Sequence, residues 1–340
     1  MAKTSEQDSG LAEGIRSIVV KLPFDLQERI LAFPFLHALR ERYPEAELHF
    51  ITPKVNIEVL NLLPFKAYYH EFDEDEISSI FDVHRFCVTL KIYNVDLFIS
   101  LTNSFPDACL GLGLKAKQRV GFSDGWKTLV LNQKTPRPVG HHVCEDFFAL
   151  YKEHVGKEVN ERMRCMSRDL SPMIEDWDEK PYFAINLAPI RSANIEEEWL
   201  HLISHFEGQR VVLFSSEEQE KTQLHIDSFL ARLPKNNTYV NFVYPTMIEL
   251  SRMIAFARGV ITYNGPVASL TAYTGSRSLI LFDREDPKRF GPFYFLADTL
   301  IVEPVVSQDA GVMKARDRFN MEEVAVKAND FFRLSIQPNH

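Results

Sequence analysis

The turn Asn264-Gly265-Pro266 is one candidate in the sequence for binding a phosphate group. An apolar, strand-like run ends there, and a helical stretch that contains residues 267–273 begins. The N–H groups and the positive dipole end at the start of a helix can bind a diphosphate. Gly-Pro is also common in ordinary turns between a strand and a helix, so a plain turn stays an alternative.

Polar residues in the N-terminal half also follow strand-like runs. Asn103 and Ser104 come after the run 96–101, and Lys54 comes after the run 47–52. Open α/β sheets bind ligands at the carboxyl ends of their strands, so these side chains are candidates for ligand binding. Lys54 is equally well explained as a plain surface residue.

The segment Asp25-Leu26-Gln27-Glu28 precedes apolar residues at helical spacing and has the pattern of a capping box. In such a box Asp25 caps the helix and Glu28 bonds back to it, which stabilises the helix by about 1 kcal/mol. These two carboxylates therefore have a structural explanation of their own.

The elements that must position these residues form two series of alternating strands and helices. Near-continuous apolar strands separated by helices predict parallel sheets covered on both faces, and hence an α/β protein with two Rossmann-like lobes facing a central cleft. The strand-like runs are residues 15–22, 47–52, 66–70, 96–101, 118–122, 182–188, 210–216, 238–243, 259–264 and 277–282. Helices are expected over residues 26–42, 55–63, 106–114, 141–156 and 321–334.

The acidic stretch 167–180 has no clear period and contains a proline, which predicts an interdomain linker. We therefore expect a disordered tail at residues 1–14 and Rossmann-like domains at 15–166 and 181–317. Residues 318–340 are expected to form a C-terminal helix and tail, with the helix packing back across the lobes.

Composition excludes several classes of protein. The chain has 340 residues, of which 45% are hydrophobic and 25% charged, as in a folded protein of two ordinary domains. Its net charge of -9 argues against a nucleic-acid binder, because neutralising phosphates needs a positive surface. No run of about 20 apolar residues and no signal-like start are present, so a cytoplasmic protein is expected. The four cysteines have no CxxC spacing, so no metal site is expected.

Four stretches together resemble the ADP-heptose:lipopolysaccharide heptosyltransferase family, glycosyltransferase family 9, whose fold is GT-B. They are residues 18–52, residues 96–122 with the motif LTNSF, residues 140–156, and residues 261–293 with the motif DPKRFGP. The resemblance implies an inverting, metal-independent transfer of a sugar. The donor is a nucleoside diphosphate sugar such as ADP-heptose, which acts as a co-substrate, and no cofactor is expected. The acceptor is a lipopolysaccharide-core or related glycan.

The resemblance also suggests a role for each candidate residue. Counting back six positions from Pro34, the catalytic Asp of the family falls on Glu28, which keeps a carboxylate and is the expected general base. Asp25 is the reserve base. Asn103, Ser104 and Lys54 lie on the acceptor side.

On the donor side, Gly265 and Pro266 match the family turn, whereas Asn264 replaces an Asp and Ser269 replaces a phosphate-binding His. Both replacements can still form hydrogen bonds, but neither adds charge. The remaining candidates for donor contact are Arg191 and Ser192 in place of a Lys, Glu217 for the ribose, and Lys288. Arg191 and Glu217 are also explained as plain surface residues, and Lys288 is also explained by packing of its own loop.

The resemblance leaves one alternative function open. Because the positions of the base and of the phosphate-binding His and Lys are all altered, the chain could instead be an impaired relative that binds a nucleotide, a glycan or a protein. For the enzyme we expect a monomer that contacts the inner face of a membrane peripherally and binds a lipid-linked or saccharide acceptor.

Overall fold

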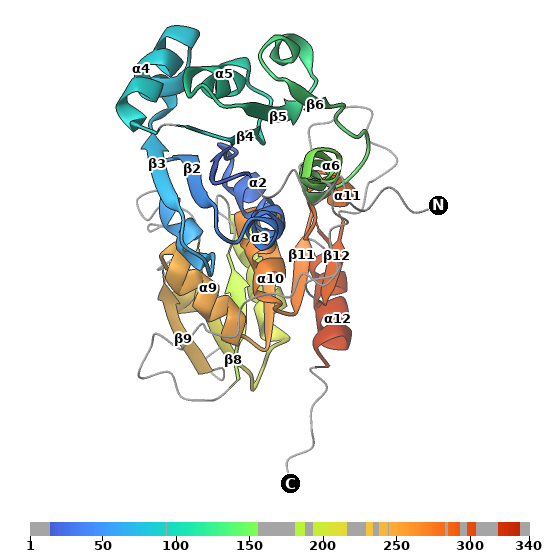
Figure 1. Cartoon of the computed structure of the whole chain (residues 1–340). Coiled ribbons are helices and arrows are strands. Elements are labelled where there is room, and N and C mark those ends of the chain that lie inside the picture. The colour runs from blue at the N-terminus through green and yellow to red at the C-terminus, as the bar shows by residue number, and fades with distance from the viewer. Residues whose placement is uncertain are drawn as a thin grey trace. The chain divides into compact units, whose positions relative to one another are not determined.

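The computed structural model describes residues 14–92, 94–155, 181–187, 193–215, 229–233, 238–243, 245–282, 285–292, 298–303 and 319–333. The chain divides into two compact units, Met1–Met163 and Arg164–His340, and each contains one parallel sheet (Figure 1). The expected linker 167–180 lies outside the described residues, so the domain boundaries given above stay a prediction.

The sheet of unit 1 has the strand order β3-β2-β1-β4-β5-β6, and all its neighbouring strands are parallel. The chain builds outward from β1 to β3 on one side and from β4 to β6 on the other, so the strand order reverses between β1 and β4. Open α/β sheets bind ligands at such a switch point. The strands are β1 Ser17–Lys21, β2 Glu47–Pro53, β3 Tyr68–Phe72, β4 Leu97–Ser100, β5 Gln118–Phe122 and β6 Gln133–Thr135.

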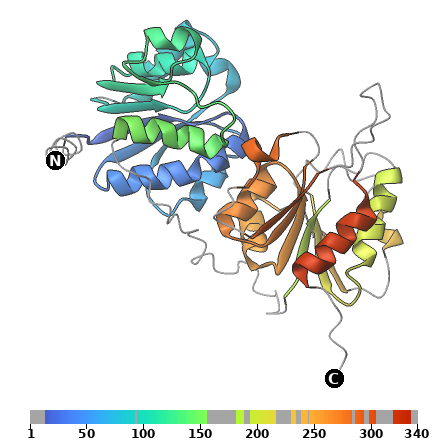
Figure 2. The ribbon, with the colours of Figure 1, turned by 90° about the vertical axis from the view of Figure 1, so that its right-hand side faces the viewer.

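Helices cover both faces of this sheet. On one face α4 (Ile80–Leu90) packs against α5 (Phe105–Gly113) over an apolar cluster that includes Val19 and Phe98. On the other face α3 (Phe33–Arg42, blue) lies beside α6 (Val143–Val155, green), as Figure 2 shows, and Phe35 contacts Phe147. The shorter elements are α2 Leu26–Leu31, η1 Ile57–Leu62, η2 Glu74–Ile77 and η3 Gly125–Leu129.

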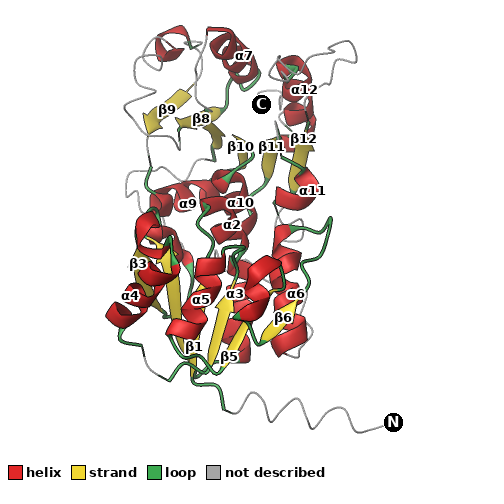
Figure 3. Cartoon of the chain, turned by 90° about the horizontal axis from the view of Figure 1, so that it is seen from above, coloured by secondary structure: helices red, strands yellow, loops and turns green. Residues whose placement is uncertain are grey.

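Unit 2 repeats this plan with the strand order β12-β11-β10-β7-β8-β9, so its switch point lies between β7 and β10. Figure 3 shows that the strands of each unit, in yellow, have helices packed against them. The strands are β7 Phe183–Asn186, β8 Arg210–Phe214, β9 Thr238–Val243, β10 Gly259–Tyr263, β11 Ser278–Leu281 and β12 Thr299–Val302. The helices are α7 Ala193–Ser204, α9 Met247–Phe256, α10 Pro266–Thr274, α11 Pro287–Phe290 and α12 Met321–Phe332.

Alternation along β11 shows how the sheet of unit 2 is buried on both faces. Leu279 and Leu281 join the core under α7 and α12, whereas Ile280 packs with Ala268 of α10. This two-residue period is that of a strand with helices on each side.

The structure corrects three details of the sequence interpretation. The predicted helix 26–42 is two helices separated at Ala32, and the predicted helix 55–63 is the 3-10 helix η1. The short strands β6 and β12 were not predicted. The C-terminal helix α12 buries its apolar face in the core of unit 2 beside α7, and its expected packing across the lobes stays a prediction.

Within the described ranges, no helix combines the length and the hydropathy needed to cross a membrane.

Candidate active site

The base loop, as we call residues 22–28, comprises the loop after β1 and the first turn of α2, and it contains both predicted base residues. It lies at the switch point of the sheet of unit 1. Asp25 is exposed and caps α2, with its Oδ1 accepting the backbone N–H of Glu28 at 2.9 Å. Glu28 lies half-buried in the first turn of the helix. The capping role predicted for Asp25 is therefore confirmed, and two carboxylates lie at the carboxyl edge of the sheet. The base role of either carboxylate stays a prediction.

Arg29, which the sequence interpretation missed, holds this loop in place. Its side chain is buried, and its guanidinium donates to four backbone carbonyls in two loops. The distances are 3.3 Å to Pro23, 2.9 Å to Phe24, 2.9 Å to Val55 and 3.4 Å to Asn56. Burial lowers the pKa of Arg29 to about 10, so the guanidinium stays charged at neutral pH. The base loop is thus tied to the loop after β2, which carries Lys54.

A second buried cation, Lys21, lies at the end of β1, immediately before the loop that contains Asp25. Its ammonium is 3.7 Å from Asp107 Oδ1, donates to the Leu22 carbonyl at 3.0 Å and lies 4.1 Å from the centre of the Phe72 ring. Burial lowers the pKa of Lys21 to about 8, because desolvation of the charge outweighs the attraction to Asp107. Lys21 therefore ties β1 to the first turn of α5.

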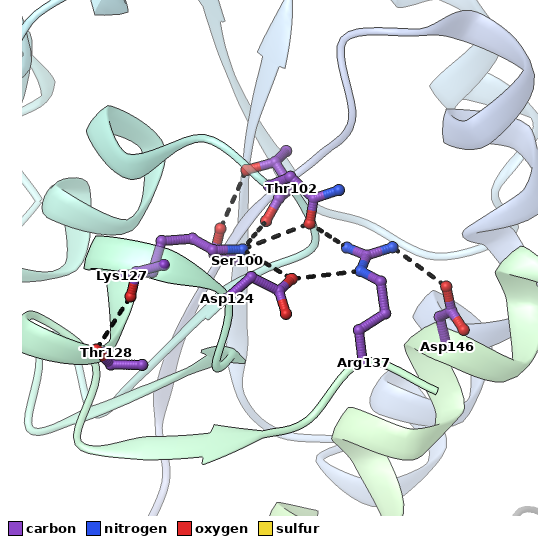
Figure 4. A network of polar contacts seen from close by, with 9 residues as sticks. Ser100, Thr102, Asp124, Lys127, Thr128, Arg137 and Asp146 are labelled. Carbon is purple, nitrogen blue, oxygen red and sulfur yellow. Dashed lines mark hydrogen bonds and ion pairs between the residues drawn. The ribbon is translucent and has the colours of Figure 1, made fainter. Parts of the chain in front are cut away.

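The loop after β4 reaches the same switch point and carries Asn103 and Ser104, as the sequence predicted. Ser104 caps α5 by accepting the N–H of Asp107 at 3.3 Å, so part of its role is structural. Asn103 is exposed, and its side-chain oxygen accepts hydrogen bonds from Lys127 and Arg137. Figure 4 shows the polar network that these two cations form with Asp124 and Asp146.

Two further residues of unit 1 lie at the ends of predicted elements, and the acceptor contact expected of Lys54 stays a prediction. Lys54 is exposed at the end of β2, where its backbone N–H donates to the Phe72 carbonyl at 3.1 Å. His142 directly precedes α6, and its Nδ1 accepts the N–H of Cys144 at 3.2 Å, so this histidine caps the helix that was predicted over residues 141–156.

In unit 2 the Asn264-Gly265-Pro266 turn follows β10 at the switch point and begins α10. Gly265 has φ 139° and ψ −163°, a conformation that is essentially restricted to glycine. Pro266 occupies the first turn of the helix, where its missing N–H costs nothing. The helix N-terminus expected to bind a diphosphate is therefore present.

The two altered family positions have different surroundings. Ser269 is only 2% exposed, and its hydroxyl has no hydrogen-bond partner among the described residues. The side-chain amide of Asn264 donates to the carboxylate of Glu285 in the loop before α11. The neutral side chain of Asn264 therefore lies next to the Glu285 carboxylate.

Of the other residues predicted to contact the donor, the structure describes only Lys288. Lys288 is exposed on α11, and its backbone N–H donates to Asp286 Oδ1 at 2.9 Å. Arg191, Ser192 and Glu217 lie outside the described residues. Trp199 of α7 is fully buried and contacts Tyr263, so it is a core residue.

A sequence model described as glycosyltransferase family 9 (heptosyltransferase) matches residues 83–313, which is more than half of the chain. The chain belongs to glycosyltransferase family 9. This member of family 9 is a glycosyltransferase of the heptosyltransferase type, with the two Rossmann-like lobes of the GT-B fold. The matched residues include the Asn103 and Asn264 loops but begin after Asp25 and Glu28.

Individual relatives of this family 9 chain are distant. The lipopolysaccharide core heptosyltransferase OpsX of Haemophilus influenzae is 22% identical over 285 residues, which cover 80% of each protein. A glycosyl transferase family 9 structure from Veillonella parvula matches with a TM-score of 0.74 at 16% identity, covering 94% of this chain and 98% of that one. E. coli heptosyltransferase WaaC, solved with ADP, matches with a TM-score of 0.69 at 14% identity, covering 86% and 94%. WaaC has also been solved with ADP-2-deoxy-2-fluoro heptose.

Proposed function

We propose that this glycosyltransferase moves a heptose, or a closely similar sugar, from ADP-heptose to a hydroxyl of the lipopolysaccharide core or a related glycan. Membership of family 9, the relative OpsX and the two WaaC structures with ADP ligands support this choice. The proposed reaction inverts the sugar and uses no metal.

In the proposed reaction the oxygen of the acceptor hydroxyl forms a bond to C1 of the heptose. The bond between C1 and the diphosphate oxygen breaks, and ADP leaves with the electron pair. A carboxylate takes the proton of the hydroxyl. Because the hydroxyl attacks opposite the leaving group, the configuration at C1 is inverted.

The observation that carries the proposal is that both predicted site loops lie at switch points. The loop with Asp25 and Glu28 follows β1 beside β4, and the Asn264 turn follows β10 beside β7. These are the places where open α/β sheets bind ligands. We assign the base to Glu28, because Asp25 already accepts the N–H of Glu28 as a helix cap. Asp25 is the alternative base.

For the donor, we assign the diphosphate to the N-terminus of α10. Its backbone N–H groups and dipole favour an anion, and the buried Ser269 hydroxyl adds a further hydrogen-bond donor there. These groups take the place of a metal in stabilising the leaving charge. Arg191, Ser192, Glu217 and Lys288 remain predicted contacts of the nucleotide sugar.

The test is to incubate the full chain with ADP-heptose and a heptose-free lipopolysaccharide core oligosaccharide, with and without EDTA. We expect a heptosylated product whose anomeric configuration, read by proton NMR, is opposite to that of the donor, formed equally fast in EDTA. A product with retained configuration would contradict the mechanism. ADP binding in calorimetry without any product would favour the alternative of an impaired relative that only binds nucleotide.

A lipid-linked acceptor would bring this enzyme to a membrane surface. Peripheral membrane contact is therefore part of the proposal. We also propose that the enzyme is a monomer. Flotation with lipid vesicles and analytical ultracentrifugation test them directly.

A further inference from the structure

Two cations converge on the side-chain oxygen of Asn103 at the carboxyl edge of the sheet of unit 1. The ammonium of Lys127, a residue only 2% exposed, lies 3.4 Å from Asn103 Oδ1. The guanidinium of Arg137 donates to the same oxygen through Nη2. These two contacts join residues 24 and 34 positions away from Asn103 in the chain.

The chemistry of the two cations fixes which way the Asn103 amide faces. Ammonium and guanidinium groups only donate hydrogen bonds, so the atom that faces them must be the oxygen. The reversed amide would direct its NH2 group at two positive charges. Among the described residues, no atom accepts from the NH2 group in the observed orientation. Asn103 therefore presents a hydrogen-bond donor at the switch point.

The two cations are themselves held from several directions (Figure 4). Arg137 Nη1 donates to the buried carboxylate of Asp146 at 3.1 Å, and its guanidinium lies 4.0 Å from the centre of the Phe122 ring. Lys127 Nζ and Arg137 Nε lie 3.4 Å and 3.6 Å from the same Asp124 oxygen. The network thus ties η3, α6 and the segment after β6 to the loop after β4.

We propose that Lys127 and Arg137 are positioning residues that fix the Asn103 amide, so that its NH2 group donates a hydrogen bond to an oxygen atom of the acceptor substrate. The proposal rests on the acceptor binding at this edge that is part of the proposed function. The hydrogen bond has a fixed direction, with Asn103 as the donor and the acceptor substrate supplying the oxygen. Asn103 selects a group with a lone pair, such as a hydroxyl, carboxylate or phosphate oxygen, and disfavours a group that only donates, such as an ammonium.

The kinetic test measures transfer from ADP-heptose while the concentration of heptose-free lipopolysaccharide core oligosaccharide is varied. Loss of one neutral hydrogen bond in Asn103→Ala should raise the acceptor KM about three- to tenfold and leave the donor KM unchanged. Asn103→Asp keeps an oxygen toward both cations but has no NH2 group, so it should fold normally and also lose acceptor affinity. An unchanged acceptor KM in Asn103→Asp would overturn the proposal.

The role of Arg137 is tested by combining variants. Arg137→Gln should raise the acceptor KM in the wild-type background and change it by less than about twofold in the Asn103→Ala background, because neighbours that act together are not additive. The same fold increase in both backgrounds would show a merely structural role and overturn the proposal. Lys134→Gln is the matched control, because Lys134 is a cation on β6 that donates to Thr128 and not to Asn103. It should leave the acceptor KM unchanged.

NMR relaxation of the Asn103 side chain tests its positioning without any heptose transfer. The NH2 signals of Asn103, assigned by their loss in Asn103→Asp, should have a high order parameter in ¹⁵N relaxation of the wild-type chain. Arg137→Gln should lower this order parameter. If the wild type transfers no heptose, the proposed function fails, while the positioning of Asn103 is still decided by this measurement. Equal order in the two proteins would overturn it.

Discussion

Replacing Arg29 by Lys is the perturbation that best tests how the base loop is held. The guanidinium of Arg29 reaches carbonyls in two separate loops because its donors point in several directions in one plane. A Lys ammonium is a single point and can serve only one of these loops. Arg29→Lys should therefore release the loop that carries Asp25 and Glu28 from the loop after β2.

The size of the effect follows from the hydrogen bonds that are lost. A hydrogen bond to a charged group contributes about 1.5–3 kcal/mol, and the carbonyls of these surface loops recover part of that from water. We expect a loss of about 2–4 kcal/mol for two lost bonds, which for a unit of this size lowers Tm by roughly 4–16 °C. A loop displaced by about 1 Å should also lower kcat about a hundredfold.

The assay combines calorimetry with heptose transfer at a temperature where the variant is fully folded. Arg40→Lys is the matched control, because Arg40 also joins loops through backbone carbonyls but does so at the opposite, amino edge of the sheet. Its acceptors are the carbonyls of Tyr43, Pro44, Ala46 and Lys66. Arg40→Lys should lower Tm and leave kcat unchanged. A wild-type kcat in Arg29→Lys, or an equal loss of kcat in both variants, would show that Arg29 does not hold the base loop in its active position.

Three further predictions concern buried or strained positions. Because the pKa of Lys21 is about 8 in the folded chain and 10.5 in the unfolded one, its charge lowers stability below pH 8 and this cost disappears as pH rises to about 10.5. In urea unfolding, the free energy of unfolding of wild type should therefore rise by up to about 3 kcal/mol relative to that of Lys21→Met between pH 7.5 and 10.5. Parallel curves of unfolding free energy against pH for the two proteins would exclude this cost. Ser269→Ala should keep or raise Tm while weakening ADP binding about three- to tenfold in calorimetry, and unchanged affinity would remove Ser269 from the donor site. Gly265→Ala, at φ 139°, should destabilise unit 2 by about 1–3 kcal/mol in urea unfolding, whereas wild-type stability would mean that the turn relaxes without cost.

The fold was largely predictable because most strands are continuous apolar runs. β6 was missed because its sequence, Gln-Lys-Thr, is polar and short, as an edge strand permits. The break at Ala32 had a signal in Pro34, whose missing N–H favours the first turn of a new helix. The burial of α12 within unit 2 depends on tertiary packing, which helical periodicity alone does not specify.

The candidate site was predictable only where a residue directly follows a strand. Asn103 and the Asn264 turn were found in this way, because strand ends are visible in the sequence. Lys127 and Arg137 reach Asn103 from other elements, and no local pattern indicates such distant contacts. Lys21 did leave a signal, since a charged residue within the apolar run before Leu22 must find a buried partner.

Single-turnover transfer from saturating ADP-heptose by wild type, Glu28→Gln and Asp25→Asn tests whether Glu28 is the general base. Asn caps a helix as well as Asp does, so Asp25→Asn should stay within about tenfold of wild type. Loss of the general base in Glu28→Gln should slow transfer about 10²- to 10⁴-fold with unchanged ADP affinity. Wild-type transfer by Glu28→Gln would contradict the assignment of Glu28 as the group that takes the acceptor proton.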